Sequence, residues 1–327
     1  MASSEYKWEQ LNDMIEGSIS KEDLVDLLPL LKVDVDDVTD DSIVVDITPD
    51  RPDLFSEEGV SRLINSYKFS KKQKRYIVHD SDYMINVDKI NSKYRPFTAA
   101  SVIKGVNLNE DKLKTIIRVQ EKLHTTLGRN REKVAIGIYP EEDIKFPISF
   151  KSLNPKKIAF QPLESERIMT AKEILTKHET GKKYSHLLKD FKKYPIFIDD
   201  SKNILSMPPI INSEFTGRVK SGKNNLFIEC SGFDLESLNF ALNLLVTMFH
   251  DMGGEIYNVK VNYPSNYFQK LNFEKSKFSF KNNFGSIKKK ISQDTPDLSF
   301  DKLKIDYYLI NKLLGHNFSK KDVNDYL

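Results

Sequence analysis

Two neighbouring stretches of the sequence gather polar side chains with which a protein can bind or hydrolyse a substrate. Pro208 and Pro209 fix the backbone φ angle and supply no amide donors, so the chain after them is expected to leave a sheet and form a wall. Asn212, Ser213 and Glu214 then offer an amide, a hydroxyl and a carboxylate on adjacent positions. Such groups position water or stabilise an oxyanion. Taken alone, Glu214 fits a solvated loop residue better.

The second stretch, 226–231, reads as a strand. Because successive side chains of a strand point to opposite faces, Phe227, Glu229 and Ser231 are expected on one face, turned toward a pocket. Cys230 falls on the other face. We expect it to be a small buried residue rather than a nucleophile.

Two further polar residues have structural explanations. Asp234 precedes the clearest helical pattern in the chain, so its main role is a helix cap, with which a place in a pocket is compatible. His124 could approach as a general base, but a structural histidine with satisfied nitrogens fits better. No spacing of His, Asp and Glu predicts a set of metal ligands. The single cysteine, Cys230, permits neither an internal disulfide nor a cysteine zinc site.

The composition indicates a soluble globular protein. Of 327 residues, 39% are hydrophobic and 30% are charged, and the length is sufficient for two or three domains. The net charge of +3 does not mark a nucleic-acid binder, so any RNA contact must come from local basic patches. The polar N-terminus resembles no secretory signal, and no window is apolar enough for a membrane helix. A cytoplasmic location is expected.

Elements of both kinds are expected along the chain, which predicts a mixed α/β or α+β fold. Helices are predicted after the capping residues Ser20, Ser56, Asn109 and Asp234, the last helix ending at Gly253. Strands are predicted at 42–47, 97–106, 134–139, 204–207 and 226–231, with a linker at 71–75. Residues 160–200 show only scattered helical signals. Residues 296–327 carry two helical patterns joined at 315–319, and the second stops soon after its cap, which suggests a truncated or split domain.

Two groups of basic residues are candidates for contact with RNA. The first stands around the end of the helix predicted after Asn109 and consists of Lys122, Arg129, Arg131 and Lys133. Here the four side chains can hold phosphates. In the second group, lysines interleave with phenylalanines at 275–281 and recur at 288–290, a pattern typical of single-strand binders. A solvated lysine-rich surface explains both groups equally well.

Several stretches, in one order along nearly the whole chain, resemble the β subunit of phenylalanyl-tRNA synthetase of the archaeal and eukaryotic type. They are Asp46–Gly59 (DITPDRPDLFSEEG), Arg95–Phe97, Gln120–His124, Val134–Gly137, Pro208–Glu214 (PPIINSE), Ile228–Asp234 (IECSGFD), and Thr295–Leu298 with Tyr307–Gly315. No Walker-type or Rossmann glycine motif is present. This agrees with the resemblance, which places ATP-dependent ligation on the partner α subunit.

The resemblance implies a division into domains. Residues 1–83 are expected to be a small N-terminal α/β domain with a linker. Residues 84–264 are expected to be a larger α/β editing domain, an aminoacyl-tRNA hydrolase. Residues 265–327 are expected to be a connecting segment and an incomplete helical domain. The implied activity is hydrolysis of tyrosine mischarged on tRNA(Phe), in a complex with the α subunit. No cofactor is expected on this chain, whereas the complete synthetase is expected to use ATP and magnesium.

The resemblance also implies roles for the residues of the two stretches. One of Glu214 and Glu229 would accept the tyrosyl hydroxyl, and the choice between them stays open. Donors that position water or bind the oxyanion would come from Asn212, Ser213, Gly232 and, on the strand face, Ser231. Pro208, Phe227 and Asp234 would line the pocket. Water activation would fall to a carboxylate or to the terminal ribose hydroxyl of the tRNA.

Two other functions are compatible with the sequence. The chain could be a structural, tRNA-docking subunit of the synthetase without editing activity. Alternatively, the helical pair within 296–327 could be a DNA-binding helix-turn-helix. That second alternative is weak, because residues 320–325 (KKDVND) mix charges and form no basic recognition helix.

Overall fold

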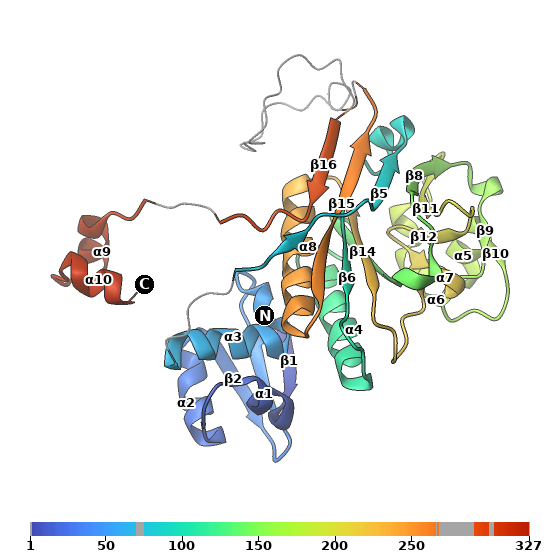
Figure 1. Cartoon of the computed structure of the whole chain (residues 1–327). Coiled ribbons are helices and arrows are strands. Elements are labelled where there is room, and N and C mark those ends of the chain that lie inside the picture. The colour runs from blue at the N-terminus through green and yellow to red at the C-terminus, as the bar shows by residue number, and fades with distance from the viewer. Residues whose placement is uncertain (1, 70–74, 266, 268–290, 301–303, 327) are drawn as a thin grey trace. The chain divides into compact units, whose positions relative to one another are not determined.

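The computed structural model describes residues 2–69, 75–265, 267, 291–300 and 304–326, and it divides into two compact units (Figure 1). The first unit is Met1–Asp297 and the second is Leu298–Leu327. Most of the expected linker and the lysine-rich stretches 275–281 and 288–290 lie outside the described residues, so their roles stay predictions.

The N-terminal part of the first unit is a three-stranded antiparallel sheet with helices. Its elements are β1 (Ala2–Lys7), α1 (Trp8–Met14), α2 (Lys21–Leu30), β2 (Val33–Val38), β3 (Ser42–Ile47) and α3 (Glu57–Lys68). The strand order is β1-β3-β2. Ser20 caps α2 and Ser56 caps α3, each hydroxyl accepting the backbone N–H three residues on, as predicted. Strand β1 was not predicted, because its sequence, ASSEYK, is mostly polar.

A large sheet forms the rest of the first unit. Its strands are β4 (Val78–His79), β5 (Met84–Val87), β6 (Phe97–Lys104), β7 (Val134–Pro140), β8 (Ile148–Leu153), β11 (Tyr194–Ile198), β12 (Ile204–Met207), β13 (Ile211–Asn212), β14 (Leu226–Gly232), β15 (Glu255–Tyr263) and β16 (Ile291–Thr295). The order is β13-β12-β11-β8-β5-β15-β6-β14-β7, with β4 and β16 also paired to β15. The four strands predicted for this part of the chain, β6, β7, β12 and β14, are confirmed.

Strand β15 joins the two halves of the sheet. It pairs in parallel with β4 and β5 and antiparallel with β6 and β16. The pairing with β16 brings residues 291–295 into the sheet of the first unit, although the sequence assigned them to the connecting segment. The mixed helix and strand composition confirms the predicted fold class.

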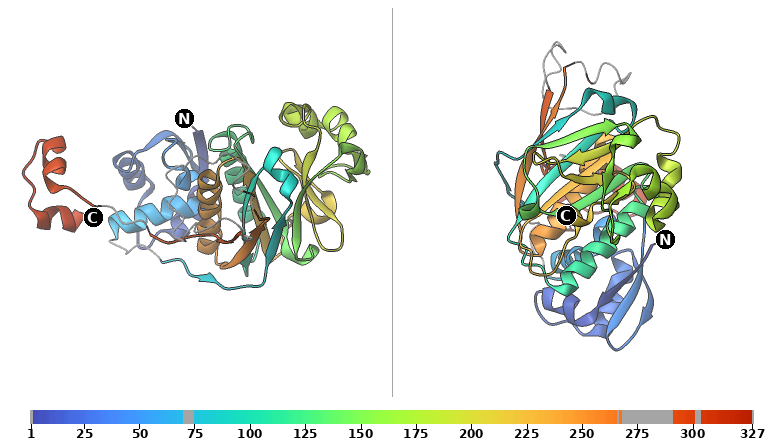
Figure 2. Two further views of the ribbon diagram at one scale, coloured as in Figure 1. Left: turned by 90° about the horizontal axis from the view of Figure 1, so that it is seen from above. Right: turned by 90° about the vertical axis from the view of Figure 1, so that its right-hand side faces the viewer.

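Helices α4 (Glu110–Thr125) and α8 (Leu235–Asp251) begin at the predicted caps. Asn109 accepts the N–H of Lys112, and Asp234 accepts those of Glu236 and Ser237. Helix α8, orange in Figures 1 and 2, packs along β6 and β14. Gly253 ends the helix with a φ of 102° that L side chains rarely adopt.

Short elements between β8 and β12 pack in one hydrophobic core with strands β11 and β12 of the large sheet. They are β9 (Ala159–Phe160), β10 (Met169–Thr170), α5 (Ala171–Lys177) and α6 (Glu179–Tyr184), and α7 (Glu214–Gly217) follows β13. Phe160, Ile174, Tyr184 and Ile196 belong to this core. These elements are too short to show a hydrophobic period, which explains why the sequence was hard to interpret here.

The second unit contains α9 (Tyr307–Leu314) and α10 (Lys320–Tyr326), the two helices expected near the end of the chain. Gly315, with a φ of 65°, ends α9, and the Ser319 hydroxyl accepts the N–H of Asp322 at the start of α10. Leu309 and Leu313 of α9 are 50% and 75% exposed.

Candidate functional site

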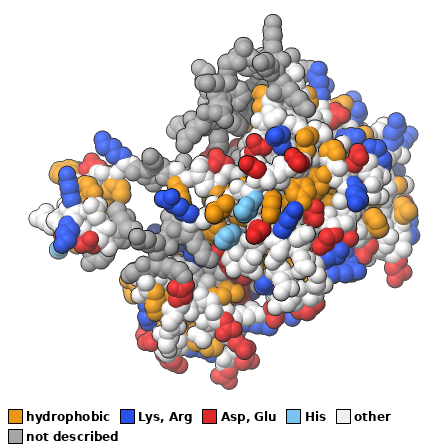
Figure 3. All heavy atoms as spheres, in the orientation of Figure 1, with side chains coloured by type: hydrophobic (Ala, Val, Ile, Leu, Met, Phe, Trp, Pro, Cys, Tyr) orange, Lys and Arg blue, Asp and Glu red, His pale blue; other side chains and the backbone are white. Residues whose placement is uncertain are grey.

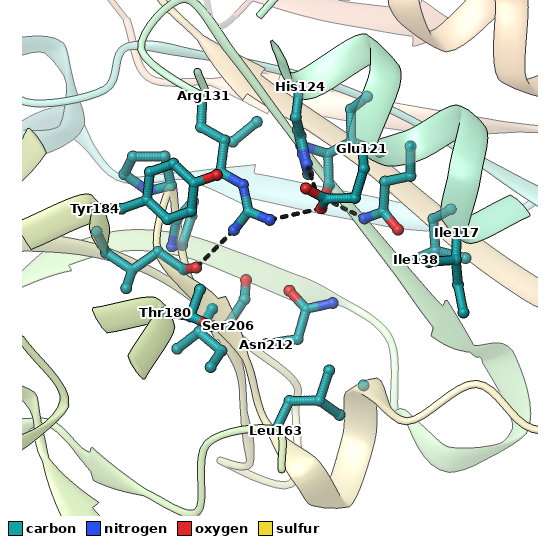
Figure 4. Close-up of a pocket in the computed structure, with 18 of the residues that line it drawn as sticks. Ile117, Glu121, His124, Arg131, Ile138, Leu163, Thr180, Tyr184, Ser206 and Asn212 are labelled. Atoms are coloured by element: carbon teal, nitrogen blue, oxygen red, sulfur yellow. Dashed lines mark hydrogen bonds and ion pairs between the residues drawn. The ribbon is translucent and has the colours of Figure 1, made fainter. Parts of the chain in front are cut away.

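A cavity of about 580 Å³ lies between two groups of elements in the first unit. Helix α4 and strand β7 form one side, and Glu229 of β14 reaches the cavity from the sheet. The segment 208–212, with residues of α6 and α7, forms the other side. Figure 4 shows Glu121 and Arg131 opposite Thr180, Ser206 and Asn212. Its aliphatic lining comes from both sides and includes Leu113, Ile116, Ile117, Ile138, Leu163 and Ile210.

Glu229 is a buried carboxyl group in this lining, with only 2% of its surface exposed. On β14 it is flanked by Ala100 of β6 and Gly137 of β7. A Cβ atom at position 137 would lie 2.6 Å from Oε1 of Glu229 and 2.2 Å from the hydroxyl of Tyr139. Glycine at 137 therefore makes the space that both side chains occupy.

The carboxyl group of Glu229 has one satisfied oxygen and one free oxygen. The Tyr139 hydroxyl lies 3.1 Å from Oε1 and 3.4 Å from Oδ1 of Asn212. Oε2 has no hydrogen-bond partner among the described residues. Burial raises the pKa of Glu229 to about 8, against the opposing effects of the Tyr139 hydroxyl, the Arg95 charge and the Ser231 hydroxyl. At neutral pH the group is therefore mostly an uncharged acid with an unused polar atom.

The predicted alternation of β14 is confirmed, but only Glu229 of its three polar-face residues lines the cavity. Phe227 is fully buried and stacks on Tyr139 at 5.7 Å between ring centroids, so it packs against the ring whose hydroxyl contacts Glu229. The Ser231 hydroxyl accepts a hydrogen bond from Nε of Arg95 at 3.1 Å. The prediction that Phe227 and Ser231 face this pocket is wrong, because neighbouring side chains cover both.

In the loop after Pro208, too, only some of the predicted residues line the cavity. Pro208, Pro209 and Asn212 line the cavity, as expected, whereas Ser213 and Glu214 do not. The Ser213 hydroxyl accepts the N–H of Phe215 and caps α7.

Glu214 is held by other partners. It pairs with Arg218 and accepts the N–H of Glu164 at 3.0 Å, and the hydrogen bond from Arg218 lowers its pKa. Of the two candidate glutamates, Glu229 is therefore the one in contact with the cavity.

The remaining residues of the second stretch have structural surroundings. Asp234 caps α8, as expected, and is not part of the cavity lining. Gly232 also lies outside the lining, packed so closely that a Cβ there would meet the carbonyl oxygen of Lys133 at 2.1 Å and Leu238 of α8 at 3.1 Å. Cys230 is fully buried on the face opposite Glu229, and burial raises its thiol pKa well above the ordinary value. It is not a thiolate nucleophile.

His124 is a satisfied structural histidine, as expected. Its Nε2 accepts the backbone N–H of Ile136 at 2.9 Å, and Nδ1 lies 3.2 Å from Oε1 of Glu121. Burial lowers its pKa, so the ring is neutral, with the proton on Nδ1. Gln120, one turn earlier, donates from Nε2 to the carbonyl oxygen of Ile136 at 2.8 Å. Two side chains of α4 thus satisfy both backbone groups of one residue of β7.

Arg131 was predicted to contact RNA, but its guanidinium group instead holds the rim of the cavity together. It donates to the carbonyl oxygen of Ile210 at 2.9 Å, lies 2.7 Å from Oε1 of Glu121, and stacks 4.4 Å over the ring of Tyr184 (Figure 4). Hydrogen bonds from His124 and the charge of Arg131 lower the pKa of Glu121 to about 2. Glu121 and Tyr184, with Tyr139, are site residues that the sequence did not reveal.

The other three basic candidates have no common arrangement at the site. Arg129 and Lys133 are exposed, and Lys122 donates to the carbonyl oxygen of Ser3. On the face shown in Figure 3, Lys and Arg side chains are interspersed with Asp and Glu. Within the described residues, no cluster of His, Cys, Asp and Glu has the geometry of a metal site. None of the described helices has the length and apolarity to cross a membrane.

The chain is similar to archaeal proteins of one kind. It is 38% identical to the phenylalanine–tRNA ligase β subunit of Methanosphaera stadtmanae over 260 residues, 79% of this chain and 46% of that protein. It is 36% identical to the β subunit of Pyrococcus furiosus over 97% of this chain and 53% of that protein. The chain thus spans about half the length of these curated relatives. No protein-family model matches it.

A solved structure gives the same result. The crystal structure of an N-terminal fragment of the phenylalanyl-tRNA synthetase β subunit from Pyrococcus horikoshii superposes with a TM-score of 0.88 at 35% identity. The superposition covers 99% of this chain and 88% of the fragment. With sequence and fold in agreement over nearly its whole length, this chain belongs to the phenylalanine–tRNA ligase β-subunit family.

Proposed function

We propose that the chain hydrolyses the ester of tyrosine mischarged on tRNA(Phe), with Glu229 as the group that recognises the tyrosyl hydroxyl. The observation that carries the proposal is a buried carboxyl group in the cavity lining whose Oε2 has no hydrogen-bond partner among the described residues. Volumes of roughly 300–1,000 Å³ are typical of small-molecule pockets. The cavity, at about 580 Å³, is large enough for an aromatic amino acid.

A buried polar group without a partner discriminates between tyrosine and phenylalanine. With Glu229 protonated, its hydroxyl donates to the phenolic oxygen, and with Glu229 ionised, the phenol donates to Oε2. Phenylalanine offers neither bond and leaves the group unpaired. A site built to hydrogen-bond a hydroxyl rejects the analogue that lacks it by roughly 10⁴-fold or more. Editing needs this preference, because a synthetic pocket rejects an added hydroxyl only by about a hundredfold.

Glu164 and Glu179 line the cavity but are exposed, and the three other acid or histidine side chains of the lining favour substrate-assisted hydrolysis. Glu229 is mostly protonated at neutral pH, and Glu121 is a weak base with a pKa of about 2. His124 uses both ring nitrogens within the fold. We therefore assign activation of the water to the ribose hydroxyl next to the ester. Asn212, half-buried in the lining, is the side chain best placed to orient the ester or the water.

The proposal includes the assembly in which the chain works. Its relatives are named as β subunits of a ligase, so we propose that it associates with an α subunit and with tRNA(Phe) in the cytoplasm. Ligation with ATP and magnesium would take place on the α subunit. The similarity to these β subunits gives no support to the DNA-binding alternative.

Deacylation of purified tRNA(Phe) charged with tyrosine or with phenylalanine tests the proposal. Wild-type chain is expected to release tyrosine and to spare phenylalanine. Glu229→Ala should slow tyrosine release by about tenfold to a hundredfold, the loss expected for a buried hydrogen bond to a polar group. Glu214→Ala is the matched control, because Glu214 lies outside the cavity lining, and it should leave the rate unchanged. If wild-type chain released no tyrosine, the tRNA-docking alternative would replace this proposal.

A further inference from the structure

A second, smaller cavity of about 210 Å³ lies beside the first. Its wall is rich in aromatic rings, from Tyr94, Phe191 and Phe233, and it also contains Arg95. We call it the aromatic cavity. Phe233 is 49% exposed, and its ring lies 5.5 Å from the guanidinium carbon of Arg95. Tyr94 and Phe191 lie 5.6 Å apart between ring centroids.

Arg95 is a buried cation that pairs with no carboxylate of the described residues. It is 2% exposed, and its hydrogen bonds go to the hydroxyl and carbonyl oxygens of Ser231 and to the carbonyl oxygen of Glu132. A guanidinium group carries five N–H donors, so two have no acceptor among the described residues. Burial lowers the pKa of Arg95 to about 10, and the group is still charged at neutral pH. Its unused donors are suited to acceptor atoms of a ligand.

The two cavities share a wall. Pro209 lines both of them. Arg131 lines the first cavity, and the next residue, Glu132, lines the aromatic cavity. Likewise, Tyr184 lines the first cavity and His186 lines the aromatic cavity. A ligand that spans this wall would have one group in each cavity.

We propose that the aromatic cavity binds a nucleobase from the single-stranded end of the RNA whose ester enters the first cavity. This inference rests on the proposed function. Unpaired bases are recognised by stacking on aromatic rings and arginine planes, with hydrogen bonds to their edges. The aromatic cavity offers both kinds of contact. Its volume is below the roughly 300 Å³ at which pockets for whole drug-sized ligands begin, which fits one planar base rather than a nucleotide.

The charges around the aromatic cavity agree with RNA as the ligand. Exposed lysines at positions 182, 189 and 192 stand beside it in the sequence and outnumber the exposed acids Glu132 and Asp190, and His186 in its lining is also exposed. Side chains of this kind hold phosphates without reading sequence. They would track the backbone on either side of the bound base.

Fluorescence of an uncharged acceptor-stem hairpin tests the inference. The probe carries 2-aminopurine at one unpaired 3′ position at a time, and stacking quenches its emission. Wild-type chain should quench one position more than the others. Phe233→Ala should weaken that binding by about tenfold, a typical loss for one base–aromatic stack. Phe240→Ala is the matched control, because Phe240 is 46% exposed and lines neither cavity.

Several outcomes separate this inference from the proposed function. Glu229→Gln should leave the quenching unchanged, because the hairpin carries no amino acid and so places no side chain in the first cavity. In deacylation, Phe233→Ala should raise KM more than it lowers kcat. Absence of quenching at every position, or equal losses in Phe233→Ala and Phe240→Ala, would overturn the nucleobase site. Quenching that depends on Phe233 in a chain that releases no tyrosine would keep the site and refute the hydrolysis.

Discussion

The hydroxyl of Tyr139 lies 3.1 Å from Oε1 of Glu229, on two neighbouring strands of one sheet. This contact orients the carboxyl group so that Oε1 is occupied and Oε2 has no partner among the described residues. Phe227 stacks beneath the Tyr139 ring, and Gly137 leaves room for both side chains. The recognition group of the proposed editing site is thus set by residues of β7 as much as by β14.

Removal of the Tyr139 hydroxyl should loosen this arrangement. In Tyr139→Phe the Glu229 carboxyl group loses its donor and stays buried, which should cost about 1–3 kcal/mol of unfolding free energy. Discrimination between tyrosyl and phenylalanyl esters should fall, because Glu229 is no longer fixed. Urea unfolding and deacylation measure the two effects. Tyr67→Phe, at an exposed position, serves as control and should change neither. Equal discrimination in Tyr139→Phe and wild type would contradict the orienting role.

The pH dependence of stability should report on Glu229. Its pKa is about 8 in the folded state and ordinarily 4.5, so the folded state binds the proton more tightly. This contribution to stability is complete below about pH 4.5 and is lost as the pH rises toward about 8. Glu229→Gln cannot ionise, so its stability relative to wild type should grow over that range in urea titrations.

Glu214→Gln gives the opposite control, because the pKa of Glu214 is lowered in the folded state. Its contribution is present above about pH 4.5 and is lost below that, and it should be small because the pair with Arg218 is partly exposed. A wild-type chain whose stability difference from Glu229→Gln is flat with pH would show that Glu229 is not buried as described.

A methyl group at position 137 should impair the site without unfolding the chain. The Cβ of Gly137→Ala lies 2.6 Å from Oε1 of Glu229 and 2.2 Å from the hydroxyl of the buried Tyr139, so both side chains must shift. Tyrosine release should drop by about tenfold or more, the effect of a misplaced hydrogen bond. Gly232→Ala is the contrasting variant, because its Cβ meets the backbone of Lys133 at 2.1 Å and should lower the melting temperature far more. Melting curves of both variants measure the loss of stability, and deacylation rates measure the loss of activity.

Of the basic residues near the end of α4, one should affect stability and two should affect only RNA binding. Arg131→Ala should lower stability by about 1–3 kcal/mol, because it removes bonds to Ile210 and Glu121. Arg129→Ala and Lys133→Ala should leave stability unchanged, since both side chains are exposed. If these two contact phosphates, each should reduce the slope of log K against log salt by about one. An unchanged slope in both would remove them from the RNA interface.

The sequence predicted local features well and the composition of the site only in part. Helix caps such as Ser56 and Asp234, and the alternation around Glu229, depend on neighbouring residues and are confirmed. The site itself joins α4, β7, β14 and the loop after Pro208, which are distant in sequence. No local pattern indicates that Tyr139 reaches Glu229. Ser213 and Glu214 were assigned to the pocket from the family resemblance of residues 208–214, whereas in the structure they begin a short helix, α7, outside the cavity lining.

Strand β7 ends the large sheet, and its outer edge has no neighbouring strand among the described residues. An unpaired edge is a template on which a second chain can add a strand, the first step of aggregation. At Ile136 this opportunity is closed, because Gln120 and His124 of α4 already occupy its carbonyl oxygen and its N–H. The neutral histidine can do so only while Nε2 stays unprotonated. A solvent acidic enough to charge that ring would therefore free the N–H of Ile136 for another acceptor, next to the proposed editing site.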